Sequence, residues 1–255
     1  MIPLPVVPLK GVAVLVTRPA EQSEALCKKI NDLGGDAIRF PTIAIEAIAI
    51  EENTHEYDWV IFVSANAVQY GLGYIKRGEH TRIAAIGKAT AAALEARNVR
   101  VDATPIQSVT SEALLAHPAL ATIATQSVLI AKGVGGRELL YDSLTQRGAH
   151  VAILDVYRRV PPTVSAESVA QLERRWHDEG IDIVTLTSVE SLDNLQTFLT
   201  DAGRALLAST PFVALSERIA AAARTVGLYG CCVLSRSADD ESIVGAIAAW
   251  HMRAR

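Results

Sequence analysis

Apolar residues along the chain gather in short continuous runs, and each run is followed by a segment whose apolar residues recur at helical spacing. Such runs lie at Gly11–Val16, Tyr57–Val63, Ile83–Ile86 and Ser127–Ala131. Continuous apolar character is typical of strands that are covered on both faces, as in parallel sheets. The pattern therefore predicts an α/β protein with doubly wound parallel sheets.

Local signals mark the expected helix boundaries. A helix is predicted from about Glu21 to Leu33, because Pro19 suits a first turn and Gly34 suits a C-terminal stop. A second helix should begin at Gly87–Thr90 and run to about Arg97, with Asn98 as a left-handed stop. Further helix starts are predicted at Ser64–Asn66 and at Ser108–Glu112. A glycine-rich turn at Lys132–Gly136 should lead, with a start at Gly133–Arg137, into a helix through Leu139, Leu140 and Leu144 that ends at Gly148.

The segment Val151–Pro162 predicts a connection between two packed bodies. It opens as a buried strand, continues through Tyr157, Arg158 and Arg159, and ends at paired prolines. Prolines lack the amide donor that a central strand needs, so the ladder must stop there. We interpret the segment as a strand that leaves one body and becomes a linker, with Tyr157 either at a functional site or anchoring that linker.

The chain also contains an internal repeat. Four pairs of segments correspond in the same order, and two of them share one offset. The offsets are 148 − 34 = 114 for Val14–Gly34 with Val128–Gly148, 188 − 64 = 124 for Val60–Val68 with Val184–Leu192, and 216 − 87 = 129 for Ile83–Ala93 with Phe212–Ala222 and for Ser108, Ser111 and Leu114 with Ser237, Asp240 and Ile243. Chance similarity between generic βα units is the alternative. The constant order favours a duplication with two copies.

Several predicted helix starts share one location, the carboxyl ends of parallel strands, where α/β proteins bind ligands. Free backbone amides and the helix dipole make such starts suitable for anions. Ser64 and Ser188 are equally interpretable as ordinary helix caps. Together the starts predict a polyanionic ligand, with candidate contacts at Thr17, Arg18, Ser64, Ala65, Asn66, Lys88, Ala89, Thr90, Gly133, Val134, Gly135, Arg137, Thr187, Ser188 and Arg218.

Composition narrows the classes of function. The chain has 255 residues and a formal net charge of −4, which argues against a nucleic-acid platform. No apolar run reaches the ~18–20 residues of a membrane span, and the N-terminus lacks a basic region typical of signal peptides. We therefore expect a cytoplasmic protein. The three cysteines predict thiols, and the six histidines show no ligand spacing, so no metal and no cofactor are expected. The turn at Lys132–Gly136 is only a weak nucleotide signal, because Glu138 breaks the GxGxxG pattern.

Seven motifs taken together resemble the uroporphyrinogen-III synthase family. They are VTRP at 16–19, FVSANAV at 62–68, AAIGKATAAAL at 84–94, GVGGREL at 133–139, VYRR at 156–159, LTSVESLDNL at 186–195 and ALSERIAAAA at 214–223. Each motif alone is only weakly specific for the family, and the specific feature is the order and spacing of all seven along the chain. The sequence departs from the family pattern in the second copy, where Ser216-Glu217-Arg218 replaces Gly-Lys-Ala-Thr and Glu217 should face solvent or pair with Arg218.

The resemblance implies two flavodoxin-like domains joined by a two-stranded β linker. It assigns residues 1–38 and 161–255 to one domain and residues 44–156 to the other, with crossings at 39–43 and 157–160. The duplication alone would have predicted two sequential halves. The interleaved division therefore comes from the resemblance.

The resemblance further implies a cyclising lyase of haem biosynthesis that closes the linear tetrapyrrole hydroxymethylbilane to uroporphyrinogen III, inverting ring D through a spiro intermediate. Tyr157 is the candidate general acid for loss of the terminal hydroxyl, because a phenol keeps its proton at pH 7. The expected state is a monomer that takes its polycarboxylate substrate by transient hand-over from the bilane-forming enzyme. The alternatives are a two-domain small-molecule binding or sensor protein and a nucleotide-dependent enzyme.

Overall fold

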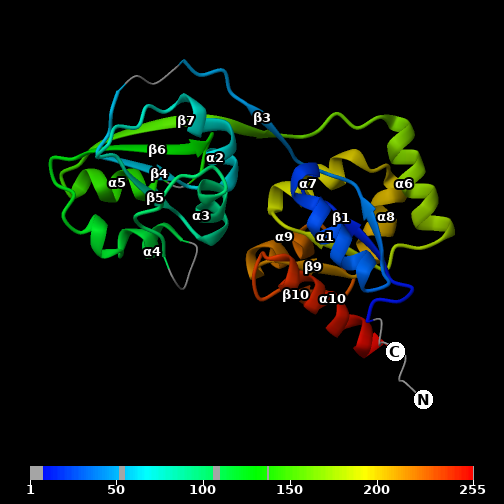
Figure 1. Cartoon of the computed structure of the whole chain (residues 1–255). Coiled ribbons are helices and arrows are strands. Elements are labelled where there is room, and N and C mark those ends of the chain that lie inside the picture. The colour runs from blue at the N-terminus through cyan, green and yellow to red at the C-terminus, as the bar shows by residue number, and fades with distance from the viewer. Residues whose placement is uncertain (1–7, 52–54, 106–109, 137, 255) are drawn as a thin grey trace. The chain divides into compact units, whose positions relative to one another are not determined.

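The computed structural model describes residues 8–51, 55–105, 110–136 and 138–254. The chain divides into two compact units. Unit one combines residues 1–44 with 160–255, and unit two is formed by residues 45–159. Both contain a five-stranded sheet with helices packed on its two faces (Figure 1). The α/β class expected from the continuous apolar runs is confirmed.

The sheet of unit one has the strand order β10-β9-β8-β1-β2, and its neighbouring strands run parallel. Counted along the chain within the unit, this is the order 2-1-3-4-5 of flavodoxin-like sheets. The strands are β1 (Ala13–Val16), β2 (Asp36–Arg39), β8 (Ile183–Leu186), β9 (Phe212–Ala214) and β10 (Cys232–Leu234).

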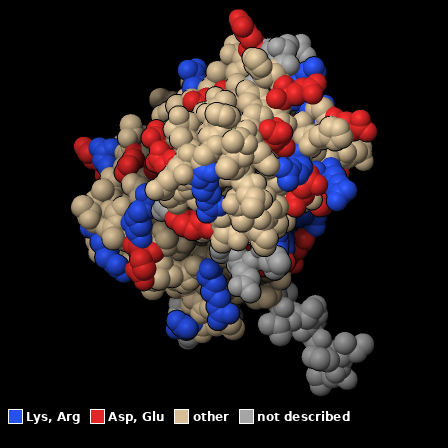
Figure 2. Space-filling model, turned by 90° about the vertical axis from the view of Figure 1, so that its left-hand side faces the viewer, with Lys and Arg blue, Asp and Glu red and all other residues tan. Residues whose placement is uncertain are grey.

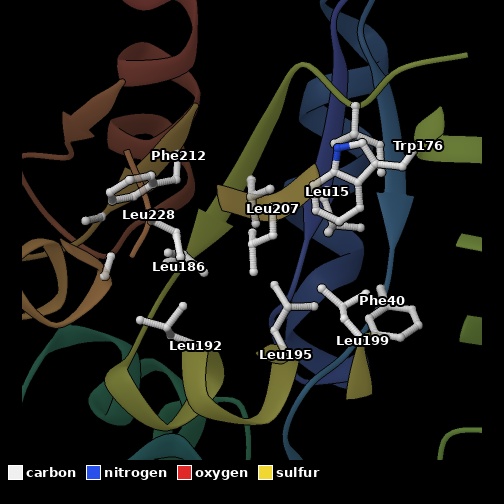
Figure 3. Packing of buried hydrophobic residues seen from close by; sticks show 14 of the residues in the cluster. Leu15, Phe40, Trp176, Leu186, Leu192, Leu195, Leu199, Leu207, Phe212 and Leu228 are labelled. Carbon is white, nitrogen blue, oxygen red and sulfur yellow. The ribbon is translucent and has the colours of Figure 1, made fainter. Parts of the chain in front are cut away.

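Helices cover both faces of this sheet, because successive strand residues point to opposite sides. Leu15 contributes to the layer beneath α6 (Ala166–Asp178), α7 (Val189–Phe198), α8 (Asp201–Ser209) and α9 (Glu217–Thr225). In Figure 3 the side chains of Leu15, Leu195 and Leu207 gather within that layer. The neighbouring residues Val14 and Val16 pack on the other side, against α1 (Ala20–Asp32) and α10 (Asp240–Ala254).

The sheet of unit two has the order β3-β7-β6-β4-β5. Its strands are β3 (Ala44–Ala47), β4 (Trp59–Phe62), β5 (Arg82–Ala85), β6 (Ser127–Gly133) and β7 (His150–Val160). One face packs against α2 (Ala65–Gly71) and α3 (Lys88–Glu95), and the other against α4 (Ser111–Leu115) and α5 (Leu139–Gln146). Short 3₁₀ turns lie at Leu72–Tyr74 and Pro118–Leu120. The paired strands β3 and β7 lie where the chain passes between the units.

The two sheets correspond strand by strand, but in permuted chain order. If the strands of unit two are numbered starting from β6, their order is β6, β7, β4 and β5. The fifth position is taken by Ala103, which forms a parallel bridge to Ala84. This again gives the spatial order 2-1-3-4-5. The repeat offsets pair β1 with β6, β4 with β8 and β5 with β9, and each pair occupies equivalent sheet positions. The first two strands of the first copy thus share a sheet with the last three strands of the second.

Most helix boundaries lie close to the expected ones. Helix α1 ends at Asp32 before Gly34, whose φ is +80°, and Asn98 adopts φ 57° after α3. The helix predicted through Leu139, Leu140 and Leu144 up to Gly148 is confirmed as α5. Its predicted start at Gly133–Arg137 is too early, because Gly133 still belongs to β6 and α5 begins only at Leu139. Gly135 and Gly136 have positive φ and keep the chain in a loop after the strand. The cap of α4 is Thr110, and the expected Ser108 lies outside the described residues.

Candidate functional site

A pocket of about 430 Å³ lies at the carboxyl edge of the sheet in unit two. Parallel strands end together at this edge, which is where α/β folds bind ligands. The pocket is built by the ends of β4, β5, β6 and β7, the loop after β6, and the starts of α4 and α5. Its polar lining consists of Ser64, Thr110, Ser111, Glu112, Lys132, Glu138, Tyr141, Tyr157 and Arg159, and its apolar lining of Val63, Ile86, Ile130, Val134, Leu140 and Ile153; Gly133, Gly135 and Gly136 complete it.

Tyr157 lines this pocket and is held there on several sides. Only 4% of the residue is exposed, and its hydroxyl lies 3.2 Å from Ser64 Oγ. The ring of Tyr70 lies 6.2 Å away between centroids. A register shift between β6 and β7 pairs Lys132 with Asp155 but Gly133 with Tyr157. This bulge turns the strand so that Tyr157 sits opposite a glycine.

Gly133 provides the space that the tyrosine ring occupies. A Cβ atom at this position would lie 2.6 Å from Tyr157 Cζ, closer than real Cβ contacts allow. The backbone amide of Val134 donates to the carbonyl of Tyr157 at 2.9 Å, which fixes the two segments against each other. A side chain at residue 133 is therefore incompatible with the observed position of the phenol.

Ser64 follows the buried strand β4 and begins α2. Its Oγ accepts a hydrogen bond from the backbone amide of Ala67 at 2.9 Å, so it is the helix cap. Ala65 is exposed and Asn66 is half-buried at the same helix start. The capping interpretation from the sequence is thus confirmed for Ser64, which also contacts the phenol.

The start of helix α3 is the second predicted anion contact of unit two. Its N-cap, Gly87, makes no side-chain capping bond, so no side chain competes for the first amides. Lys88 and Ala89 are exposed, and no ion pair of Lys88 occurs within the described part of the chain. Thr90 is 3% exposed, so its hydroxyl is turned away from solvent and only its backbone is suited to contact a ligand there.

The glycine-rich loop after β6 is held by its own lysine. Lys132 Nζ donates to the carbonyl of Gly135 at 2.8 Å and lies 3.8 Å from Asp155 Oδ1. Its charge is therefore already used within the loop, which weakens the nucleotide interpretation further. Gly133, Val134 and Gly135 all line the pocket, whereas Arg137 lies outside the described residues.

In unit one, the end of β1 is filled by the protein's own side chains. Thr17 is fully buried, its Oγ1 donates to the carbonyl of Thr185 at 2.5 Å, and Ser191 Oγ donates to it at 3.0 Å. Thr42 Oγ1 lies 2.7 Å from Ser191 Oγ and completes the cluster. The Thr17 side chain therefore has no free surface for substrate, contrary to the expectation from the sequence.

Arg18 is likewise engaged within unit one. Its guanidinium pairs with Asp240 at 2.5 Å and donates to the carbonyl of Ala238. Nearby, hydrogen bonds from Ser237 and Ser242 lower the pKa of Asp239 to about 2, so this carboxylate stays charged at neutral pH. The end of β1 is consequently a self-contained ionic cluster.

The remaining candidates of unit one lie at the starts of α7 and α9. Ser188 accepts from the amide of Ser191 at 3.0 Å and Ser216 from that of Ile219 at 3.4 Å, so both are caps. Thr187 is half-buried. Glu217 and Arg218 are exposed, and no ion pair joins them in the described part of the molecule. Glu217 thus faces solvent, one of the two outcomes expected.

Three further observations concern metals, membranes and surface charge. Over the described residues, no group of His, Cys, Asp and Glu side chains is arranged to hold a metal ion. No helix in the same ranges is both long and apolar enough to cross a bilayer. On the face drawn in Figure 2, Lys and Arg side chains alternate with Asp and Glu, so no extended field of one sign appears there.

Sequence reasoning missed the pocket wall formed by α4. Thr110, Ser111 and Glu112 line the pocket, and Thr110 Oγ1 caps α4 by accepting from Ala113 at 3.1 Å. The helix start expected at 108–112 was the available signal. No apolar run that would predict a strand directly precedes it in the sequence.

Comparison with known proteins gives one consistent family. The family model described as uroporphyrinogen-III synthase HemD matches residues 24–244. A uroporphyrinogen-III synthase of Salmonella typhimurium is 32% identical over 252 residues, covering 92% of this chain and 99% of that protein. The corresponding Escherichia coli enzyme is 30% identical with the same coverage. The crystal structure of uroporphyrinogen-III synthetase from Helicobacter pylori shares the fold, with a TM-score of 0.64, 12% identity, and coverage of 94% of this chain and 99% of that one.

Proposed function

Because this chain belongs to the uroporphyrinogen-III synthase family, we propose that it converts hydroxymethylbilane to uroporphyrinogen III in haem biosynthesis. The reaction closes the linear tetrapyrrole with inversion of ring D through a spiro intermediate. It releases the terminal hydroxyl as water, which makes the enzyme a cyclising lyase. Tyr157 carries this proposal, because a buried phenol is held at the pocket where substrate chemistry is expected.

In the proposed mechanism, the phenol of Tyr157 donates its proton to the departing hydroxyl. Water leaves, the pyrrole nitrogen supplies electrons to the exposed carbon, and an azafulvene forms. The substituted α-carbon of ring D attacks that carbon and forms the spiro intermediate, the bond from this α-carbon to the methylene of ring C breaks, and that methylene then bonds to the other, unsubstituted α-carbon of ring D. A proton released from the substrate as the pyrroles regain aromaticity restores the phenol. General-acid assistance of this kind typically contributes about 10²–10⁴-fold.

Substrate carboxylates are the proposed ligands of the helix starts. In unit two we assign them to the backbone amides after Ser64 and Gly87, to Lys88, and to the loop at 133–136. In unit one the remaining candidates are Thr187, Ser188 and Arg218. Since α3 has no side-chain cap, its amides meet a carboxylate without displacing an internal partner. These contacts fold the flexible chain so that the spiro closure outruns direct closure.

We further propose that the protein works as a monomer, without a cofactor, and receives the bilane by transient hand-over from the enzyme that makes it. The bilane closes in water without inversion, so a short transfer time favours the inverted product. No lasting complex is required for this, because only the delay between release and capture matters.

The proposed function is tested by incubating the protein with freshly made hydroxymethylbilane, oxidising the products, and separating the porphyrin isomers. We expect predominantly the isomer with ring D inverted. A binding or sensor protein would leave the isomer ratio at the value found in buffer alone, and that result would overturn the proposal.

A further inference from the structure

The hydroxyl of Ser64 has two neighbours, and only one of them is explained by helix capping. Its oxygen accepts from the Ala67 amide at 2.9 Å and also lies 3.2 Å from the oxygen of Tyr157. A serine hydroxyl has one proton and two lone pairs. With one lone pair given to the amide, the proton is still free to be donated to the phenol oxygen.

The state of Tyr157 decides the direction of this hydrogen bond. A neutral phenol either donates to or accepts from Ser64. Once the phenol has given up its proton, its oxygen only accepts, and the bond must run from the Ser64 hydroxyl to the phenolate. Hydrogen bonds to a charged oxygen are about twice as strong as neutral ones. The contact therefore strengthens as the proton leaves, which is the property that accelerates a reaction.

We infer that Ser64 is a positioning residue for the proposed reaction, donating to the oxygen of Tyr157 as the phenol gives up its proton. The inference rests on the proposed function and adds a role for Ser64 beyond capping or carboxylate binding. The duplicated fold supplies the contrast. Ser188 caps α7, the helix of unit one equivalent to α2, and Ser216 caps α9, and among the described residues neither has a tyrosine hydroxyl as a hydrogen-bond partner. A serine that only caps a helix therefore does not need a tyrosine hydroxyl beside it.

The test compares variants that separate capping from donation. Ser64→Ala removes both functions, Ser64→Gly removes the hydroxyl at a position where glycine caps nearly as well, and Ser64→Thr keeps a hydroxyl. Ser165→Ala is the matched control, because Ser165 caps α6 by accepting from Ser168 at 3.1 Å. We expect Ser64→Ala and Ser64→Gly to lower kcat by about 10- to 100-fold with little change in KM, the loss of one hydrogen bond to a charged group.

The double variant with Tyr157→Phe provides a readout that a purely structural role would not give. If Ser64 acts through the phenol, Ser64→Gly should cost nothing more once Tyr157 is phenylalanine, because effects on one shared interaction are not additive. Ser64→Thr should keep kcat within about threefold of the parent, and Ser165→Ala should leave kcat unchanged.

Two results would overturn the inference. One is a Ser64→Gly variant with the parent kcat. The other is a loss that appears in KM, or that adds fully to that of Tyr157→Phe, since Ser64 would then contact substrate directly. A normal rate in Tyr157→Phe alone would instead contradict the general-acid role in the proposed function, so the two failures are distinguishable.

Discussion

The two units carry the same fold, but their strand ends differ at one equivalent place. The offset of 114 pairs Lys132 with Arg18, and both cations are used internally, by Asp155 and Gly135 in unit two and by Asp240 in unit one. Around the end of β1 in unit one, buried hydroxyl groups fill the space. After β6 in unit two, the glycine-rich loop lines a pocket instead.

The comparison shows how a duplicated fold divides its tasks. In unit one, Thr42 reaches Ser191 and joins a cluster that ties β1, β8 and α7 together. In unit two, the bulged strand brings Tyr157 to Ser64 and to a pocket instead. Buried hydroxyl clusters with satisfied hydrogen bonds stiffen a fold, and an unfilled edge is where a ligand fits. We therefore propose that the chemistry takes place in unit two, whereas the hydroxyl cluster at the end of β1 has a structural role.

The largest expected effect concerns the interleaved units themselves. Residues 44–156 expressed alone should fold cooperatively, because they contain the strands and both helix layers of one sheet. Residues 1–127 should not fold, because they contain parts of both sheets and complete neither. Circular dichroism during urea titration measures this. A cooperative transition for 1–127 together with its absence for 44–156 would contradict the division.

Tyr157→Phe should have the largest effect of any single substitution in the pocket. We expect kcat to fall near the low end of the ~10²–10⁴-fold range for a general acid, because positioning of the bilane is unaffected. The products should become richer in the non-inverted isomer, since spontaneous closure then competes. Product binding should be retained. Tyr74→Phe, at an exposed tyrosine of unit two, is the control. If Tyr157→Phe turned over at the wild-type rate, Tyr157 would not act as a general acid, and the site would consist of positioning contacts alone.

Gly133→Ala should come next, because a methyl group there displaces the phenol ring. A shift of about 1 Å in a reacting group can cost about 10²-fold in rate. Gly73→Ala is the matched control in the same unit, since a Cβ at Gly73 meets no atom within 4 Å. Steady-state kinetics on both variants measures the contrast. Equal activity of the two would show that the close approach of Gly133 to Tyr157 is not needed for turnover.

Ser191→Ala tests the closed edge of unit one. It leaves the hydroxyls of Thr17 and Thr42 without their shared partner, which should lower the free energy of unfolding by about 1–3 kcal/mol. Below the unfolding transition, kcat should stay near that of the parent, because the cluster has no assigned chemistry. Ser209→Ala changes an exposed hydroxyl and serves as the control. Should Ser191→Ala lose turnover while keeping its stability, the division of tasks between the units would be wrong.

Lys88→Gln should have the smallest effect. Lys88 is exposed, and contacts between exposed charges are worth about 0.2–1 kcal/mol, so KM should rise up to about fivefold with kcat little changed. The rise should shrink at high salt, where such contacts are screened. Lys28→Gln in α1, which removes an exposed ion pair with Asp32, should leave KM unaltered. A KM for Lys88→Gln that equals the parent value at low salt would remove this carboxylate contact.

The sequence allowed the layers, most helix starts and the correspondence between copies to be predicted, because these depend on local periodicity and capping. Continuous apolar runs such as Tyr57–Val63 predict strands that are buried on both faces. Ser64 and Ser188 are helix caps, in agreement with the capping interpretation from the sequence. The interleaving of the copies was not predictable from periodicity, since which strands share a sheet is decided by long-range pairing.

The site was less predictable, because local pattern does not report what fills a strand end. Thr17 and Gly133 each come at the end of a strand that the sequence predicts equally well. The side chain of Thr17, however, is covered by Ser191, a residue 174 positions away in the chain. The bulge that turns Tyr157 toward Ser64 depends on pairing between β6 and β7 and has no signature within either segment. The candidate residue types could thus be identified in the sequence, but the solvent accessibility of their side chains could not be predicted from it.

Amide hydrogen exchange of the full chain, with and without bound uroporphyrinogen III, tests the central claim most directly. If the pocket of unit two holds the tetrapyrrole, exchange should slow on product binding at residues 64–67, 87–90 and 133–136, and should stay unchanged at residues 17–20. Protection that appears at 17–20 and is absent from all three segments of unit two would contradict the assignment of the chemistry to that edge.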